Sequence, residues 1–234
     1  MKQLRISAKN LGYLTLPNFC PRCFWIKMHM RFKLPYQIFP GIFSSIDSYS
    51  KKITNYYYEK HGNLSEWFKD FNISEPIKVP SLRDFYIIDQ ETNIKLTGIP
   101  DEMFLRTDES YFIADYKTAR FTSHQDELIP MYEVQLNGYA YIAERVGYKP
   151  MTGLGLIYYE PFTDITPDLI DDYAENDGFY MYFYAHTMGI KFDPDMIPVL
   201  LQKARQLYDK LSPPDPVVDF KDCRTVEELK NVLQ

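Results

Sequence analysis

Two carboxylates and one ammonium group lie in neighbouring strand-like runs in the middle of the sequence. Asp101 lies inside the run 94–105, and Asp115 and Lys117 close the run 111–117. Side chains two residues apart in a strand point to the same face, so Asp115 and Lys117 share a face. If the two runs pair, all three charges converge, and two adjacent carboxylates would raise the pKa of one of them. A divalent cation such as Mg²⁺ or Mn²⁺, which prefers oxygen ligands, removes that cost.

The residues around this group favour chemistry at a phosphate. A lysine beside a metal-binding pair can orient an attacking water, help to deprotonate it, or stabilise charge on a phosphoryl transition state. Gln135 and Tyr139 follow, four residues apart and therefore on one face of a helix. Gln135 can hydrogen-bond the water or a phosphate oxygen. The hydroxyl of Tyr139 can contact a phosphate, or its ring can stack on a base.

Hydrophobic periodicity predicts the elements that must position these side chains. Helical patterns are expected in residues 1–35, 44–60, 129–147 and 193–211, and strand patterns in 77–79, 84–89, 94–105, 111–117, 153–161 and 178–192. The order predicts an α/β fold with one central mixed sheet flanked by helices. We expect one domain over 1–234: a helical basic region 1–75, a core 76–211 and a tail 212–234. The tail contains a capping-box pattern, the signal of a helix start, that begins at Thr225.

Composition and charge limit the classes of protein to which this chain can belong. Hydrophobic residues make up 45% of the 234 residues, which suffices for a sizeable core. The absence of an apolar run of 18 residues argues against a membrane span, and the N-terminus lacks an apolar signal core, so we expect a cytoplasmic protein. Residues 1–60 carry ten Lys and Arg against two acids, whereas the remainder carries 16 against 30. A basic segment on an acidic body is a plausible footprint for nucleic-acid phosphates.

Three short patterns in this order resemble the PD-(D/E)xK nuclease superfamily, and its RecB-like branch in particular. They are Gly98-Ile-Pro-Asp101, Asp115-Tyr-Lys117 and Gln135-x-x-x-Tyr139, with an N-terminal CPRCFWIK at 20–27, so the resemblance spans about residues 7–159. It implies a restriction-endonuclease-like core that cleaves DNA with Mg²⁺ or Mn²⁺. It further implies that Asp101, Asp115 and the backbone carbonyl of Tyr116 bind the metal. Lys117, Gln135 and Tyr139 would then complete the catalytic site.

The chain departs from that branch in two ways. The branch usually has a metal-binding His on the helix after an N-terminal glycine, but PGIFSSIDSYSKK at 40–52 has none; Asp47 or Ser45 occupies that neighbourhood, and His61 follows later. Asp47 is our candidate for the missing ligand, and a looser site or reduced activity is the alternative. Iron–sulfur members, including CRISPR-associated spacer-acquisition exonucleases, use four cysteines. Only Cys20, Cys23 and Cys223 are present, so we expect no iron–sulfur cluster and no disulfide framework; a three-thiolate metal site is the alternative.

Other polar residues have simpler, structural explanations. Glu102 should point to the opposite strand face from Asp101 and lie on the surface, and Arg22 either contacts phosphate or lies along its helix. His29, His124 and His186 fit no ligand spacing. The main hypothesis is a metal-dependent DNase acting on single strands or DNA ends, without a membrane partner. The alternatives are a catalytically weak or inactive nucleic-acid-binding module of the same fold and an interaction protein with an aromatic surface.

Overall fold

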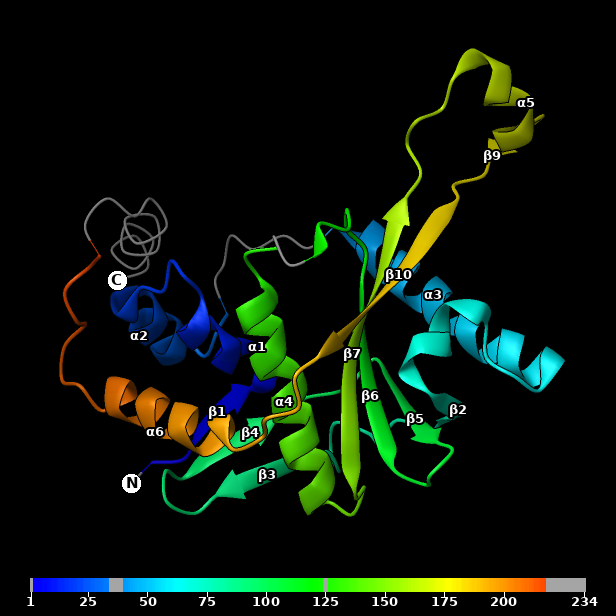
Figure 1. Cartoon of the computed structure of the whole chain (residues 1–234). Coiled ribbons are helices and arrows are strands. Elements are labelled where there is room, and N and C mark those ends of the chain that lie inside the picture. Colours follow the sequence, from blue (N-terminus) through cyan, green and yellow to red (C-terminus); the bar gives the residue numbers. More distant parts are fainter. Residues whose placement is uncertain (1, 34–39, 124–125, 218–234) are drawn as a thin grey trace.

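Two β-sheets form the centre of the computed structural model, which describes residues 2–33, 40–123 and 126–217 (Figure 1). The larger sheet has the order β10-β7-β6-β5-β2, in which only β6 and β7 run parallel. Its strands are β2 (Ile73–Ile77), β5 (Glu102–Arg106), β6 (Tyr111–Lys117), β7 (Met151–Pro161) and β10 (Phe183–Ile190). The smaller sheet has the order β1-β4-β3, with β1 (Leu4–Ser7), β3 (Tyr86–Asp89) and β4 (Ile94–Thr97). The predicted α/β fold with a mixed sheet is confirmed.

Side-chain alternation in the larger sheet gives each face its own core. Met103 and Ile113 point to the face covered by α4 (Ile129–Arg145). The other face carries Phe104 and Phe112, which pack against η2 (Glu66–Phe71). A long helix, α3 (Gly41–His61), lies on this second side, where the hydroxyls of Thr54 and Tyr116 are hydrogen-bonded at 3.0 Å. The sheet is therefore enclosed between α4 and the α3–η2 layer.

The N-terminal segment packs against the outer side of α4. It comprises β1, α1 (Ala8–Leu11), η1 (Gly12–Thr15) and α2 (Pro21–His29). A side chain at Gly138 of α4 would meet the Cβ atom of Ala8 at 2.6 Å, so the glycine allows the two helices to approach closely. The C-terminal helix α6 (Met196–Tyr208) is tied to the smaller sheet by Arg205, which donates to the carbonyls of Lys2 and Thr92.

Three helices occur where periodicity predicts them. The predicted helix 44–60 is α3, and it ends at Gly62, whose φ of 72° is the left-handed conformation that glycine adopts easily. The predicted helices 129–147 and 193–211 are α4 and α6. These segments combine an apolar stripe with recognisable end signals, which is the strongest local pattern a sequence offers.

Several predicted elements differ from the structure, and two of them differ in kind. The run 94–105 is not one strand, because it divides into β4 and β5, which belong to different sheets. Asp101 consequently lies just before β5 instead of inside a strand, after a break at Gly98–Pro100. The region 1–35 is not wholly helical, because it begins with β1, which pairs in parallel with β4. The four residues of β1 alternate in burial, but so short a run beside a helical pattern is easily assigned to the helix.

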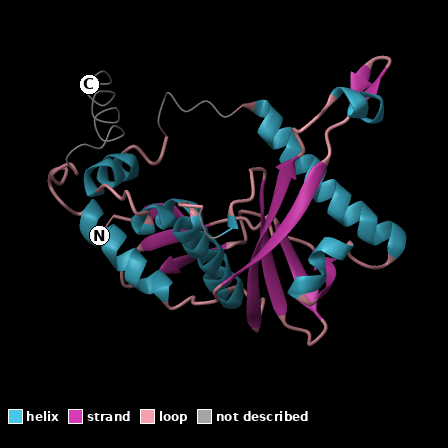
Figure 2. Ribbon diagram, turned by 45° about the horizontal axis from the view of Figure 1, so that its top comes forward, coloured by secondary structure: helices cyan, strands magenta, loops and turns pink. Residues whose placement is uncertain are grey.

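A projecting arm joins β7 to β10 (Figures 1 and 2). It contains η4 (Pro167–Leu169), α5 (Ile170–Tyr173), β8 (Ala174–Glu175) and β9 (Gly178–Phe179), and its residues are mostly exposed. The predicted strand 178–192 is shorter and begins at Phe183. No helix in the described ranges is long and apolar enough to cross a membrane. His124, Cys223 and Thr225 lie outside the described residues.

Candidate functional site

The residues of the three sequence patterns meet in one hollow of about 660 Å³, at the end of the larger sheet where β6 finishes. Asp101 comes from the segment before β5, Asp115 and Lys117 from β6, and Gln135 and Tyr139 from α4. The rest of the wall includes Lys9, Tyr13, Phe43, Ser44, Asp47, Tyr116 and Tyr132. Residues separated by more than 100 positions in the sequence therefore surround one space.

Asp115 is the buried centre of the hollow. It is 3% exposed, and its Oδ1 atom accepts a hydrogen bond of 2.8 Å from Nε2 of Gln135. Its Oδ2 atom pairs with the ammonium of Lys117. Burial raises the pKa of Asp115 above its ordinary value; Lys117 opposes this rise, and the negative charge of Asp101 reinforces it. A carboxylate in such surroundings gains from a cation of higher charge.

Asp101 faces Asp115 from the neighbouring chain segment. The register of β5 and β6 pairs Glu102 with Ala114, which places Asp101 beside the end of β6. The backbone N–H of Tyr116 donates to Oδ2 of Asp101 at 2.9 Å. That bond uses one carboxylate oxygen for positioning and leaves Oδ1 directed toward other partners.

Lys51 of α3 is a site residue that the sequence analysis missed. Its Nζ atom donates to Oδ1 of Asp101 at 2.8 Å and to Oδ2 of Asp47 at 2.9 Å. The charges and hydrogen bonds of Asp101 and Asp47 outweigh the effect of burial and raise the pKa of Lys51. Asp47 and Lys51 are four residues apart on one helix, and that spacing was the available signal. Asp47, the candidate replacement for the missing histidine, thus lies at the edge of the hollow.

Gln135 and Tyr139 form the α4 side of the site. The Nε2 atom of Gln135 also donates to the hydroxyl oxygen of Tyr139 at 2.9 Å, while its Oε1 atom is buried without a hydrogen-bond partner. The ring of Tyr139 packs on Gly98: a Cβ atom there would lie 2.3 Å from a ring carbon. The glycine of the Gly98-x-x-Asp101 pattern is therefore required by packing, since any side chain would displace the tyrosine.

Lys117 is held from two sides. Besides its ion pair with Asp115, its Nζ atom lies 4.0 Å from the centre of the Tyr132 ring, a cation–π contact. The lysine side chain is only 14% exposed. Burial, followed by the charges of Asp126 and Asp115, raises the pKa of Tyr132 to about 12, so its ring remains neutral beside the ammonium. The lysine is positioned, charged and directed into the hollow.

Glu102 corrects one prediction. It lies on the opposite face from Asp115, as alternation requires, but it is 4% exposed rather than a surface residue. The helix α3 covers this face, and Nδ2 of Asn55 donates to Oε1 of Glu102 at 3.1 Å. Burial raises the pKa of Glu102 to about 7. Alternation gives the face of a strand residue, but it does not reveal which helix covers that face.

The remaining candidates lie away from the hollow. His61 is ten residues beyond Lys51 on α3, about 15 Å along the helix axis. His29 stacks between Trp25 and Tyr208, and His186 pairs with Glu160, as structural histidines do. Arg22 donates to the carbonyl of Pro214 at 3.4 Å.

The cysteines include one departure from expectation. Cys20 and Cys23 are buried, as small hydrophobic residues are. Cys20 is disulfide-bonded, although the sequence predicts no disulfide framework. That prediction assumed a reducing compartment. The spacing of the three cysteines gives no local signal that two of them form a disulfide.

The donors around Asp115 suit a hard cation. Within the described ranges, no three His, Cys, Asp or Glu side chains converge closely enough to hold a metal ion by themselves. Two carboxylates together with neutral oxygens are nevertheless the set from which Mg²⁺ is usually bound, because this ion keeps several waters and uses substrate phosphates. The buried Oε1 atom of Gln135 supplies an additional oxygen acceptor without a partner. Asp101, Asp115 and Tyr116 all line the hollow, so oxygen donors of the kind that a hard cation binds lie there together.

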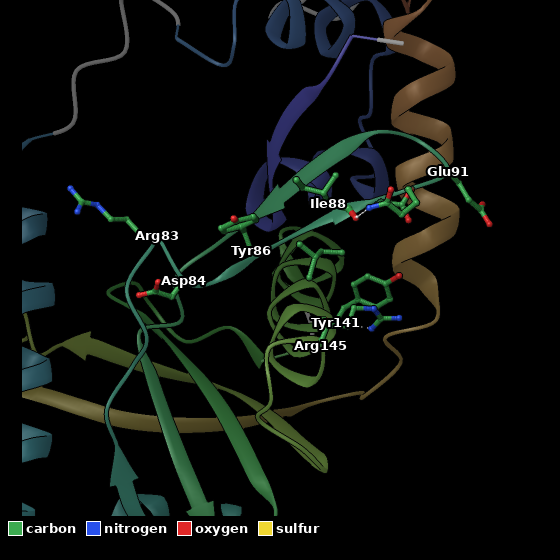
Figure 3. Close-up of a pocket in the computed structure, with 10 residues that line it drawn as sticks. Arg83, Asp84, Tyr86, Ile88, Glu91, Tyr141 and Arg145 are labelled. Carbon is green, nitrogen blue, oxygen red and sulfur yellow. Dashed lines mark hydrogen bonds between the residues drawn. The ribbon is translucent and has the colours of Figure 1, made fainter.

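A second hollow, of about 810 Å³, lies between β3 and α4 and contains none of the pattern residues (Figure 3). Arg83 and Asp84 lie at one end of it, and Tyr141 and Arg145 at the other. The guanidinium of Arg145 lies 3.4 Å from the centre of the Tyr141 ring. The acids and bases of this hollow are spread out, so it lacks the convergence seen around Asp115.

Comparison with known proteins identifies the superfamily of the chain. The crystal structure of SSO0001 matches at 15% identity over 91% of this chain and 80% of that chain, with a TM-score of 0.39, which is too low to carry an argument. No curated protein matches the chain. The sequence model of the PD-(D/E)XK nuclease superfamily matches residues 45–225, most of the chain and all three patterns. The chain belongs to the PD-(D/E)XK nuclease superfamily.

Proposed function

We propose that this nuclease-superfamily protein is a metal-dependent deoxyribonuclease that hydrolyses phosphodiester bonds in single strands or at DNA ends. The observation that supports the proposal most is the convergence of Asp101, Asp115 and Lys117 in one hollow beside Gln135. The proposal keeps the RecB-like placement of these residues. It assigns catalytic roles to Lys117 and Gln135, substrate contact to Tyr139 and cation binding to the carboxylates.

The cation would be Mg²⁺ or Mn²⁺, held by Asp101, Asp115 and the carbonyl of Tyr116, with Asp47 as a further candidate ligand. When bound, it would supply Lewis-acid stabilisation of phosphate charge and a lower pKa for a water. The buried Asp115 is the stronger of the two carboxylate sites, because its surroundings offer little competing solvation.

The side chains of the chain itself would orient the reactants. Lys117 would donate a hydrogen bond to a non-bridging phosphate oxygen and so stabilise charge that grows as the water attacks phosphorus and the P–O bond breaks. The partnerless Oε1 atom of Gln135 would accept a hydrogen bond from the attacking water. The Tyr139 hydroxyl, whose pKa burial raises, stays protonated and holds the Gln135 amide in place.

The test compares cleavage of labelled single-stranded DNA, duplex DNA and RNA in Mn²⁺. We expect cleavage of single-stranded DNA by the wild type and its loss in Asp115→Ala and Lys117→Ala. Asp171→Asn, which removes an exposed charge on the arm, should cut like the wild type. Binding without cleavage under any metal would instead identify a non-catalytic nucleic-acid-binding module. Cleavage that survives both site substitutions would overturn the proposal.

A further inference from the structure

The ammonium of Lys51 occupies one oxygen of the Asp101 carboxylate. The other oxygen, Oδ2, is already used by the backbone N–H of Tyr116. Oδ1 is therefore the oxygen without that backbone partner, and Lys51 donates to it at 2.8 Å. A lysine ammonium is a compact cation with three donors, so it satisfies the same oxygen that a hard metal ion would bind.

Asp47 supplies the second contact of this lysine. Its Oδ2 atom accepts from Lys51 at 2.9 Å, and it lies one helical turn before the lysine on α3. The side chain of Asp47 is 45% exposed and that of Lys51 is 32% exposed, whereas that of Asp101 is 22% exposed. A lysine displaced from Asp101 would consequently keep a partner near solvent and remain beside the hollow.

The backbone around Lys51 is fixed to the strand that follows Asp101. Nδ2 of Asn55 donates both to the carbonyl of Lys51 at 2.8 Å and to Oε1 of Glu102 at 3.1 Å. The base of the lysine side chain is therefore anchored, while its four-carbon stem leaves the ammonium free to move between partners.

We propose that Lys51 is a tethered competitor of the divalent cation, so that an ion reaches Oδ1 of Asp101 only by displacing the lysine ammonium. This inference rests on the proposed metal site and adds a residue that sets its affinity. Lys51 is a positioning residue: it holds Asp101 in place before the ion binds, and it raises the ion concentration that the site requires.

The test is the binding of Mn²⁺ to metal-stripped protein without DNA, measured from the electron paramagnetic resonance signal of free Mn²⁺ at pH 7.5. Lys51→Met should lower the Kd for Mn²⁺ by about tenfold, because the ion no longer replaces the charged hydrogen bond from Lys51 to Asp101. Lys51→Arg, which keeps a cation there, should bind close to the wild type. Lys52→Met, which removes the same charge from the adjacent exposed position, should change the Kd less than about twofold.

The outcomes separate this inference from the proposed function. Equal Mn²⁺ affinity in wild type and Lys51→Met, combined with loss of binding in Asp101→Asn, would overturn the role of Lys51 and leave the metal site intact. Weaker Mn²⁺ binding in Lys51→Met would also overturn the competitor role, because it would mean that the lysine helps the site to bind the ion. If neither wild type nor Lys51→Met binds Mn²⁺, both the metal site and the competitor role are wrong.

Discussion

At the scale of single residues, the site depends on acids placed where water solvates them poorly. Asp115 is 3% exposed and its charge faces that of Asp101, an arrangement that costs folding free energy unless a cation compensates it. Lys117 and Lys51 supply part of that compensation, one for each carboxylate. A perturbed acid in a hollow, such as Asp115, is typical of functional sites.

Lys117 should matter for the chemical step much more than for binding. Lys117→Met is expected to reduce the single-turnover cleavage rate by about 100-fold or more, which is the loss usual for one charge-stabilising donor. The Kd for single-stranded DNA should change by less than about fivefold, since one phosphate contact among several is lost. Lys69→Met, at an exposed lysine of η2, serves as the control and should leave the rate unchanged. A full cleavage rate in Lys117→Met would remove the lysine from the mechanism.

Glu102 should make stability depend on pH. Its pKa is about 7 in the folded chain against an ordinary value of 4.5, so between these values the folded state holds the proton more tightly than the unfolded state does. Stability is therefore lost as pH rises through this window. In EDTA at pH 8.5, Glu102→Gln should raise the free energy of unfolding in urea by about 3 kcal/mol, and the gain should vanish near pH 4.5.

Glu59→Gln, at an exposed position of α3, is the matched control for that pH profile and should show no such dependence. An equal gain for Glu102→Gln at both pH values would mean that packing, and not charge, explains the effect.

At the scale of elements, a close approach between one loop and one helix aligns the two halves of the site. Gly98 precedes Asp101 and contacts the ring of Tyr139, which in turn holds Gln135 beside Asp115. The contact couples the segment between β4 and β5 to α4. A small change at this junction should reach the proposed catalytic side chains through the tyrosine.

Gly98→Ala should therefore destabilise the fold by about 1–3 kcal/mol, because the new methyl group overlaps the Tyr139 ring. It should also lower the cleavage rate. In a Tyr139→Ala background the same change should cost almost nothing in stability, which a double-mutant cycle from urea unfolding would measure. Gly41→Ala, where a side chain meets open space, is the control. Additive costs in the cycle would exclude the proposed contact.

Local pattern predicted some elements and not others, for physical reasons. Strand β6 and helices α3, α4 and α6 have continuous periodicity, so their place is visible in the sequence. The division of 94–105 into two strands in different sheets depends on tertiary pairing, although Gly98 and Pro100 indicate a break in the strand. The contact of Lys51 with Asp101 spans 50 positions, and burial of Glu102 depends on where α3 lies. Such long-range contacts leave little trace in local spacing.

At the scale of the whole molecule, charge is divided along the chain. The first 60 residues carry a net charge of +8 and the remaining residues −14, while Lys9 and Tyr13 of this basic segment line the hollow. Lys27 lies 4.5 Å from the centre of the Tyr13 ring, so a second cation stands behind the same wall. The basic segment thus reaches the site and is suited to attract phosphates toward it.

Binding of single-stranded DNA in EDTA should accordingly weaken with salt. We expect log K to fall against log salt concentration with a slope of about −2 or steeper, which corresponds to three or more phosphate contacts. The double variant Lys9→Met/Lys27→Met should make the slope shallower, while Lys60→Met, at the far end of α3, should leave it unchanged. Fluorescence anisotropy over a salt series measures both. A flat salt dependence in the wild type would contradict phosphate recognition.

One divalent ion should join the two carboxylates, and crystals soaked in Mn²⁺ would reveal it. Anomalous scattering should show a peak within coordination distance of Asp101, Asp115 and the Tyr116 carbonyl, with the Lys51 ammonium moved away from Asp101. If saturating Mn²⁺ gave no peak between these carboxylates, or gave a peak only elsewhere in the protein, the two carboxylates would not share an ion.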